Sequence, residues 1–308
     1  MSIMIASDNT RRPELNNHQL MERAPAIFAT APTHDASARY TFIPTIDVVD
    51  GLRAEGWLPV AAKQTAAQTK DRRDTALHMV RFRHPDLEPI NIGNGNLIYP
   101  EAIMTNSHNL SNAFKFMMGA YQMLCSNGLV TGESFGSISV RHNTKAIDQA
   151  IAACFDLLDN AKPMMAQIDN FRQIELNPVQ REAFAKSALR MKHGVHAQQN
   201  DGKQVEVVFG NPRDFNQARR VAGEDSVVEY IPITPEAILS PRRREDEAPT
   251  LWNTFNVIQE NLMKGGQRSR SAKWRRNTTR GVSAIDKDVS LNRNLWGMAE
   301  YLAERVTA

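Results

Sequence analysis

The hydrophobic pattern of this chain changes its period from one segment to the next, and no other feature limits the fold as strongly. In residues 77–84 the apolar Val80 and Phe82 alternate with Arg81 and Arg83. A period of two predicts a strand with one apolar and one basic face. Other segments repeat apolar residues at steps of three and four, the period of a helix. The combination predicts an α+β fold: a small, mainly antiparallel sheet packed with helices, plus a helical C-terminal part.

Periodicity and punctuating residues also place the individual elements. Thr45 is the expected N-cap of a short helix that Gly56 ends, and Asn127 and Gly128 are expected to end a helix over residues 109–126. The expected extended segments are 57–61, 77–84, 99–105, 135–142 and 203–209, and the expected helices are 45–55, 109–126, 147–171 with an interruption at Pro163, 178–192, 252–264 and 285–306.

Composition divides the chain into four expected regions. Residues 1–38 lack periodicity and are expected to form a flexible N-terminal arm, loose or draped over the body. An α+β core domain at 39–210 is followed by a linker or surface excursion at 211–248, which is rich in proline and charge. Residues 249–308 are expected to form the helical C-terminal part, with a basic loop at 264–280.

The composition does not support a membrane protein or a disulfide-stabilised protein. No apolar run approaches the ~20 residues that a membrane-spanning helix needs. The stretch from Ser7 to Arg12 is polar and does not resemble an export signal. We therefore expect a cytoplasmic protein with no membrane partner. Cys125 and Cys154 stand among apolar residues and are expected to be buried, reduced thiols.

Positive charge gathers in residues 264–280, seventeen positions with seven cations and no acidic residue. Spaced cations neutralise phosphates and release counterions, and an indole among them can stack on an unpaired base. The segment predicts a nucleic-acid contact; the alternative is a solvated basic loop, or one that pairs with acidic surface elsewhere. The expected contact residues are Lys264, Arg268, Arg270, Lys273, Trp274, Arg275, Arg276 and Arg280.

A second basic surface is expected on the sheet. Arg81, Arg83 and Arg141 occupy alternate positions of two expected strands, and they would share one polar face if those strands are neighbours. Such a face can follow a phosphate backbone. The alternative is that these arginines pair with carboxylates, for which the candidates are Asp71, Asp74 and Asp86.

Residues 106–109, Asn-Ser-His-Asn, stand between an expected strand and an expected helix. As a capping segment they would satisfy the start of that helix, whose backbone amides could hold an anion. His108 is a candidate base, although no carboxylate or nucleophile is tied to it by spacing. Capping alone is the simpler interpretation.

No constellation for bond-making catalysis stands out, and no cofactor is expected. Asp71 and Asp74 with Glu101 are the candidates for a magnesium-dependent nuclease, but carboxylates of this kind occur by chance in most chains. His193 and His196 are separated by the helix-breaking Gly194, so we expect no metal there.

Several separated motifs, in order, resemble the phage/plasmid-like protein family of domain of unknown function 932. The motifs are Asn106-Ser107-His108-Asn109, the stretch from Tyr121 to Leu129 with Asn127-Gly128, Arg141-His142, the stretch from Phe255 to Leu262 with Gly265-Gly266, Ser283 to Asp286, and Leu291 to Trp296. The resemblance covers roughly Tyr40 to the C-terminus. Asn109 stands where the family pattern has Asp, and Gln122 where Arg is common, so roles of that acid and that cation do not transfer.

The resemblance implies a setting more than a mechanism: prophages, plasmids and other mobile elements, close to recombination, single-strand-binding or anti-defence functions. The helix followed by Gly56-Trp57, strands and a further helix is also similar to single-strand-annealing recombinases. Fold, family and charge together predict a non-enzymatic DNA-binding protein that prefers single strands and assembles into homo-oligomers.

Two other functions stay open. The first is an interaction protein that blocks a host defence complex, or binds another host or mobile-element protein, through its basic segment. The second is the metal-dependent nuclease. Neither alternative needs a membrane.

Overall fold

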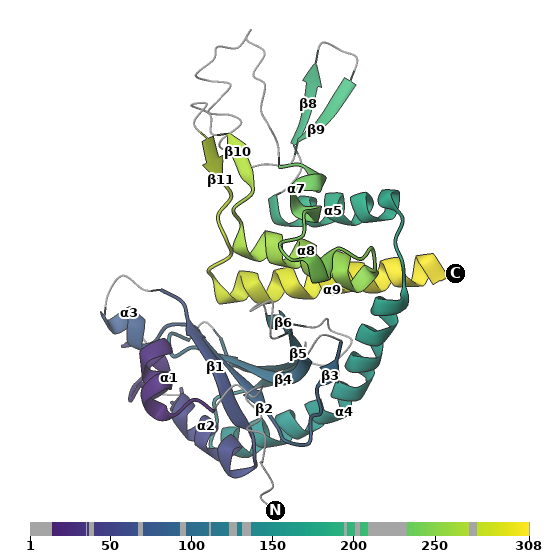
Figure 1. Cartoon of the computed structure of the whole chain (residues 1–308). Coiled ribbons are helices and arrows are strands. Elements are labelled where there is room, and N and C mark those ends of the chain that lie inside the picture. Colours follow the sequence, from purple (N-terminus) through teal and green to yellow (C-terminus); the bar gives the residue numbers. More distant parts are fainter. Residues whose placement is uncertain are drawn as a thin grey trace, which may run out of the picture. The chain divides into compact units, whose positions relative to one another are not determined.

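A computed structural model gives the fold of the chain (Figure 1). It describes residues 14–34, 36, 40–66, 70–92, 97–110, 112–122, 128–130, 137–193, 196–200, 204–208, 233–270 and 276–307. The chain forms two compact units, Met1–Met165 and Ala166–Ala308. The division falls within one long helix, and each unit has its own core.

The first unit is built on a seven-stranded sheet in which every pairing between the described strands is antiparallel. The main order is β1-β2-β4-β5-β6, with β3 added to β4 and β7 added to β5. The strands are β1 (Leu58–Gln64), β2 (His78–Arg83), β3 (Ile90–Asn91), β4 (Leu97–Asn106), β5 (Phe114–Gln122), β6 (Gly128–Val130) and β7 (Ser137–Val140). The α+β prediction is confirmed, and β2 and β7 lie within the two segments whose alternation predicted them.

The helix predicted over residues 109–126 is wrong, because this segment contains β5. It pairs with β4 over eight positions, from Thr105 opposite Lys115 to Ile98 opposite Gln122. Phe116 and Met118 of one face and Met117 and Tyr121 of the other are all buried. A strand covered on both faces loses its alternation, so its apolar residues imitate a helical stripe. Gly128 therefore begins β6 opposite Tyr121, and Asn127 and Cys125 lie outside the described residues.

Helices accompany the sheet of the first unit. They are α1 (Asn17–Arg23), the 3-10 helix η1 (Pro25–Phe28), α2 (Thr45–Ala54), α3 (Lys70–Asp74) and α4 (Ala146–Gln173). The predicted stripe of Val48, Val49 and Leu52 is fully buried in α2. Gly56, with φ +88°, follows this helix as expected. Helix α4 continues through Pro163 without the predicted interruption.

Part of the predicted N-terminal arm is a helix that packs on the first unit. Asn16 and Gln19 cap α1 reciprocally, each side chain accepting from the other residue's backbone N–H. The N–H of Leu15 donates to the carbonyl of Pro59 in β1 at 2.7 Å, and Leu20 is fully buried. The described part of the arm is therefore draped over the body, held by contacts with residues far along the chain.

The second unit is mainly helical. Its elements are the last part of α4, α5 (Pro178–His193), β8 (His196–Asn200), β9 (Gln204–Val208), α7 (Pro235–Leu239), the 3-10 helix η3 (Arg244–Asp246), α8 (Leu251–Lys264), β10 (Arg268–Arg270), β11 (Arg276–Thr278) and α9 (Ile285–Thr307). Helix α8 packs against α5, α7 and α9. Trp296 of α9 contacts Phe171 at a tilt and Phe255 edge to face, with ring centroids 5.0 and 6.0 Å away. Within the described residues, none of the helices is long and apolar enough to cross a bilayer.

A buried polar cluster joins α2 to the sheet of the first unit. The hydroxyl of Thr45 lies 2.9 Å from Nε2 of His78 and 3.1 Å from Nε2 of His108, and it accepts from the amide of Asn106 at 3.0 Å. All four side chains are buried. Thr45 is therefore not the predicted N-cap, a position that Pro44 takes, because its hydroxyl is used within the cluster.

The proton positions in this cluster follow from its geometry. Nδ1 of His78 donates to the carbonyl of Ala76 at 2.9 Å, so Nε2 of the neutral ring accepts from the Thr45 hydroxyl. Because the one hydroxyl proton is then used, Nε2 of His108 must donate to Thr45. Burial lowers the pKa of His78 to about 4 and that of His108 to about 3, which keeps both rings neutral.

Because these two histidines are buried in their neutral form, we expect the fold to lose stability in acid. Below pH 6.5 the unfolded chain binds protons at His78 and His108 that the native cluster refuses, so stability must fall as pH falls toward 4. Each ring that stays neutral in the native state lowers the free energy of unfolding by roughly 1.4 kcal/mol per pH unit below pH 6.5. The two rings together lower it by up to about 4 kcal/mol between pH 6.5 and 5. Urea unfolding of the first unit at pH 7.5 and pH 5 measures this, and His108→Asn should reduce the difference. Equal stability at both pH values would contradict the cluster.

Candidate nucleic-acid interface

The basic segment starts from the end of a buried helix. Thr250 caps α8, its hydroxyl accepting from the N–H of Asn253 at 3.1 Å. Phe255, Ile258 and Leu262 are buried along one stripe, as their spacing predicted. The helix ends at Gly265, where the predicted pair of glycines stands. Because α8 is held by the core of the second unit, its C-terminal end is a fixed point for the residues that follow.

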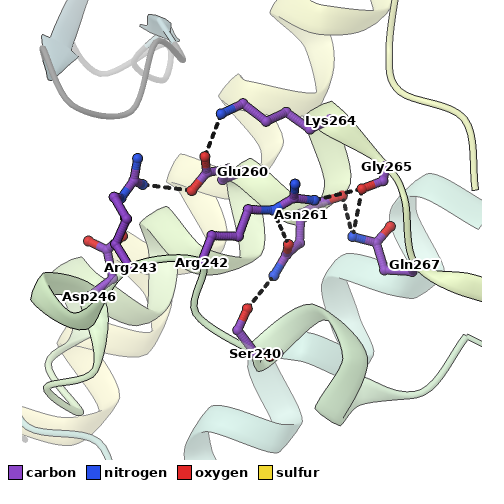
Figure 2. A network of polar contacts seen from close by, with 9 residues as sticks. All are labelled: Ser240, Arg242, Arg243, Asp246, Glu260, Asn261, Lys264, Gly265 and Gln267. Carbon is purple, nitrogen blue, oxygen red and sulfur yellow. Dashed lines mark hydrogen bonds and ion pairs between the residues drawn. The ribbon is translucent and has the colours of Figure 1, made fainter.

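A buried carboxylate lies close to this end (Figure 2). Glu260, with a side chain 3% exposed, accepts from Arg243 at 2.6 Å and from Lys264 at 2.5 Å. Arg243 also pairs with Asp246 at 2.9 Å. Burial raises the pKa of Asp246, against the lowering effect of Arg243. The two cations and two carboxylates sum to zero charge, which allows the group to be buried.

Asn261 is the neutral centre of the same network (Figure 2). Its amide nitrogen donates to the carbonyls of Ile238 and Ser240, each at 2.9 Å, and its amide oxygen accepts from Arg242 at 2.9 Å. Arg242 donates in turn to the carbonyl of Gly265 at 2.7 Å. A residue of the predicted surface excursion thus satisfies a backbone oxygen at the helix end.

The segment after Gly265 is tied to the segment that returns. Gln267 donates to the carbonyl of Asn261 at 2.8 Å and accepts from the Thr279 hydroxyl at 2.5 Å. The backbones of Gln267 and Thr279 are also bonded, N–H of Thr279 to the carbonyl of Gln267 at 2.9 Å. The N–H of Val282 donates to the carbonyl of Met263 at 2.8 Å. Both ends of the basic segment are therefore fastened to α8.

The described part of the basic segment is a β-hairpin rather than the predicted loop. Strand β10 pairs with β11, with Arg268 opposite Thr278 and Arg270 opposite Arg276. The side chains of Arg268 and Arg280 are exposed, and no carboxylate of the described residues pairs with either. Lys264, in contrast, is paired with Glu260. Lys273, Trp274 and Arg275 lie outside the described residues.

A lysine of α5 joins the base of this hairpin to a second one. Lys192, in the last turn of α5, donates to the carbonyl of Leu262 and, at 3.5 Å, to that of Arg280. Burial lowers its pKa to about 8. Helix α5 leads into the hairpin of β8 and β9. The starting points of two hairpins are thus held together in the second unit.

The structure places two of the three predicted sheet arginines in an ion-pair cluster. Arg81 and Arg83 both form ion pairs with Glu101, at 3.2 and 2.8 Å. Their guanidinium groups lie over the rings of Tyr121 and Tyr99, respectively 4.2 and 3.7 Å from the ring centroids. The side chains of both arginines are about nine-tenths buried. A carboxylate does pair with them, but it is Glu101, which was not among the expected partners; of those, Asp74 and Asp86 form no ion pair with either arginine, and the side chain of Asp71 lies outside the described residues.

Arg141 is separate from that cluster. It follows β7, its side chain is exposed, and neither an ion pair nor a hydrogen bond of its side chain occurs with the described residues. The three arginines therefore do not form one exposed face.

The motif residues 106–108 do not cap a helix, because no helix follows them. Asn106, Ser107 and His108 are fully buried, and Asn106 and His108 belong to the polar cluster with Thr45. Neither the predicted capping role nor the alternative of an anion site at a helix start applies to this part of the described chain. Glu101, proposed as a magnesium ligand, has its oxygens bonded to two arginines, and the described residues contain no group of three side chains placed to ligate a metal.

Sequence reasoning missed the residues that fasten the hairpin: Arg242, Glu260, Asn261 and Gln267. Arg242 and Arg243 stand beside Glu245, Asp246 and Glu247 in sequence, so the run appeared to be neutralised locally. A usable signal was present in α8, where Glu260 and Asn261 occupy buried positions of a helix that is buried on most sides. Polar residues at such positions need partners, which must come from distant segments.

The family described as "Domain of unknown function (DUF932)" matches residues 33–296. The chain is 35% identical over 288 residues to "UPF0380 protein YafZ" of Escherichia coli (strain K12), covering 94% of this chain and 91% of that protein. The same identity and coverage hold for "UPF0380 protein YfjQ" of that strain. No solved structure gives a significant match.

Alanine substitutions at two glycines, Gly265 at the base of the hairpin and Gly297 in α9, are predicted to have opposite effects on stability. Gly265 has φ +67° and ψ −148°, and an added Cβ would collide with the carbonyl oxygen of Thr279. Gly265→Ala should therefore lower the free energy of unfolding by about 1–3 kcal/mol. Gly297 lies in the middle of α9 with no atom within 4 Å of an added Cβ. Gly297→Ala should be neutral or stabilise by up to about 1 kcal/mol. Urea denaturation measures the free energy of unfolding of both variants. Equal effects would contradict the close contact between Gly265 and Thr279 at the base of the hairpin.

Proposed function

This chain belongs to the DUF932 family, and from that premise we propose that it is a DNA-binding protein of a mobile genetic element, a phage or plasmid, which binds and anneals single-stranded DNA without catalysis. Among the described residues no catalytic constellation competes with this function, since Glu101 and His108 are both engaged in buried contacts.

One observation carries the proposal: the segment 264–280 holds seven cations and no acidic residue, and its described strands form a hairpin whose base is fixed to α8. A folded protein could have neutralised this segment with its own carboxylates. At the base of the hairpin one cation is neutralised in this way, because Lys264 forms an ion pair with Glu260. Arg268 and Arg280, next to this base, are exposed and have no carboxylate partner within the described residues. Charge that is left free on a fixed support suits a polyphosphate ligand.

The fixed base matters for affinity. Each cation that neutralises a phosphate releases a condensed counterion, whose entropy supplies most of non-specific binding. A hairpin held by Asn261 and Gln267 keeps its starting direction. Less conformational freedom is then lost when DNA binds, since the base is ordered beforehand.

The preference for single strands rests on Trp274. It stands between Lys273 and Arg275 in the acid-free segment. An indole stacks on a base whose face is open, and a base inside a duplex offers no such face. In this proposal Lys273 and Arg275 bind the phosphates on either side of the stacked base. Arg81 and Arg83 have no part in it, because they are engaged with Glu101. Homo-oligomers would align several hairpins along one strand.

The charge of the hairpin predicts the salt dependence of binding. Replacing the exposed Arg268 and Arg280 by Ala should weaken binding to a single-stranded oligonucleotide. It should also lower the slope of log K against log salt by about 1.4, roughly 0.7 for each lost phosphate contact. Fluorescence anisotropy at several salt concentrations measures both.

The matched control is Arg190→Ala with Arg305→Ala, which removes two exposed cations of the same unit outside the hairpin. It should leave the slope unchanged. An unchanged slope in the hairpin variant, or an equal change in both variants, would refute the interface. If the wild type binds no oligonucleotide at low salt but forms a stable complex with a host protein, the interaction alternative holds instead.

Strand preference can be tested separately at Trp274. Trp274→Ala should weaken single-strand binding by about 5- to 150-fold, equivalent to the roughly 1–3 kcal/mol of one stacked base. Trp274→Phe should retain most of the affinity. Duplex binding, measured in the same buffer, should change little in either variant. An equal loss on both kinds of DNA would show that Trp274 supports the hairpin rather than a base.

A further inference from the structure

The first unit contains a groove that the proposed function does not use. It has a volume of about 410 Å³ and lies between β7 and α4. The residues that line it are Ile138, Ser139, Val140, Arg141, Asn143, Gln149, Ala152, Ala153 and Asp156. Those of α4 follow the spacing i, i+3, i+4, i+7, which places them on one face of the helix. Its two walls are therefore one strand and one helix face.

The strand wall offers unused hydrogen-bonding groups. Among the described strands, β7 pairs only with β5, from Phe114 opposite Val140 to Met117 opposite Ser137. In an antiparallel pair every second residue turns both its N–H and its C=O away from its partner strand. Among the described strands, the second edge of β7 therefore has no partner, and residues of β7 line the groove. A free edge accepts an added strand through main-chain hydrogen bonds.

The dimensions of the groove suit a short extended segment. From Gln149 to Asp156 the helix rises about 10 Å, at ~1.5 Å per residue. From Ile138 to Arg141 the strand also spans about 10 Å, at ~3.3 Å per residue. The two walls match in length, and three or four residues of extended chain fill them. Small side chains at Ala152 and Ala153 leave room for the side chains of such a segment.

Charges of opposite sign mark the two ends of the groove. The amide of Asn143 donates to Gln149 at 3.3 Å, so the end of β7 with Arg141 adjoins the first turns of α4. Asp156 lies two turns farther along the helix. Neither the Arg141 nor the Asp156 side chain has an ion-pair partner among the described residues. A ligand that complements the groove carries a carboxylate at one end and a cation at the other.

We propose that this groove binds an extended peptide segment of a partner protein, added as a strand along β7, with an acidic group at Arg141 and a basic group at Asp156. A nucleic-acid strand fits the groove less well, because its phosphates would meet Asp156. The inference is independent of the hairpin and of the proposed function.

A charge-swap selection tests the proposal. Random decapeptides displayed on phage are selected on the full chain and on the double variant Arg141→Glu with Asp156→Lys. The wild type should enrich peptides with an acidic and a basic residue three or four positions apart in one order. The double variant should enrich the reverse order. Selection of the same peptides by both proteins, or enrichment of none by the wild type, overturns the proposal.

The peptides enriched on the wild type then measure the groove directly. Ala152→Trp places a large side chain at an exposed groove position and should weaken peptide binding at least tenfold in fluorescence polarisation. Lys162→Trp, exposed on α4 but outside the groove, is the matched control and should bind as the wild type does. Both variants are checked by thermal melting. Equal affinities for the two variants would place the peptides elsewhere and overturn the proposal.

A competition experiment with an oligonucleotide distinguishes binding at this groove from binding at the hairpin. A single-stranded oligonucleotide should not displace the bound peptide, and the charge-swapped variant should keep its DNA affinity. Displacement together with lost DNA affinity would make the groove a nucleic-acid site and overturn the peptide proposal. Loss of DNA binding in the hairpin variant alone leaves the groove unaffected, so the two proposals fail independently.

Discussion

The arrangement of the second unit depends on one buried carboxylate and the amide beside it. Glu260 forms ion pairs with Arg243 and Lys264. Asn261 accepts a hydrogen bond from Arg242 and donates to a carbonyl of α7 and to one in the segment after it. A buried ion pair stabilises little by itself, but loss of one partner leaves an uncompensated charge. Both residues take partners from the segment 240–246, so the network holds this segment against the end of α8. That placement fixes the end of α8 and hence the starting direction of the basic hairpin.

The same network divides the charge of the chain into neutralised and free parts. Arg81, Arg83, Arg243 and Lys264 each meet a carboxylate within the fold. Arg268 and Arg280 do not meet one among the described residues. The total charge of +3 therefore says less about partners than the position of the unpaired cations. Those of the hairpin favour polyphosphate, whereas the opposite charges of the groove on β7 favour a peptide.

Local pattern predicted much of the fold, and contacts between distant segments account for what it missed. Strand β2, the stripe of α2 and the end of α8 at Gly265 follow from periodicity and from glycine. Strand β5 was mistaken for a helix because both its faces are buried, which removes the polar alternation that identifies a strand. The capping interpretation of His108 depended on that false helix, and its actual partners, Thr45 and His78, are far away in sequence. For the same reason the sequence did not identify Glu101 as the partner of two arginines. The acid-free segment was visible in the sequence, whereas the network that supports it was not.

The most direct test of the central claim is amide hydrogen exchange of the full chain, measured with and without a single-stranded oligonucleotide at low salt. If the hairpin is the interface, protection should appear in peptides spanning residues 266–282 and be lost when salt is raised. Peptides covering β2 and β4, which contain Arg81, Arg83 and Glu101, should exchange equally in both states. Protection of the sheet without the hairpin, or of neither, would contradict the account.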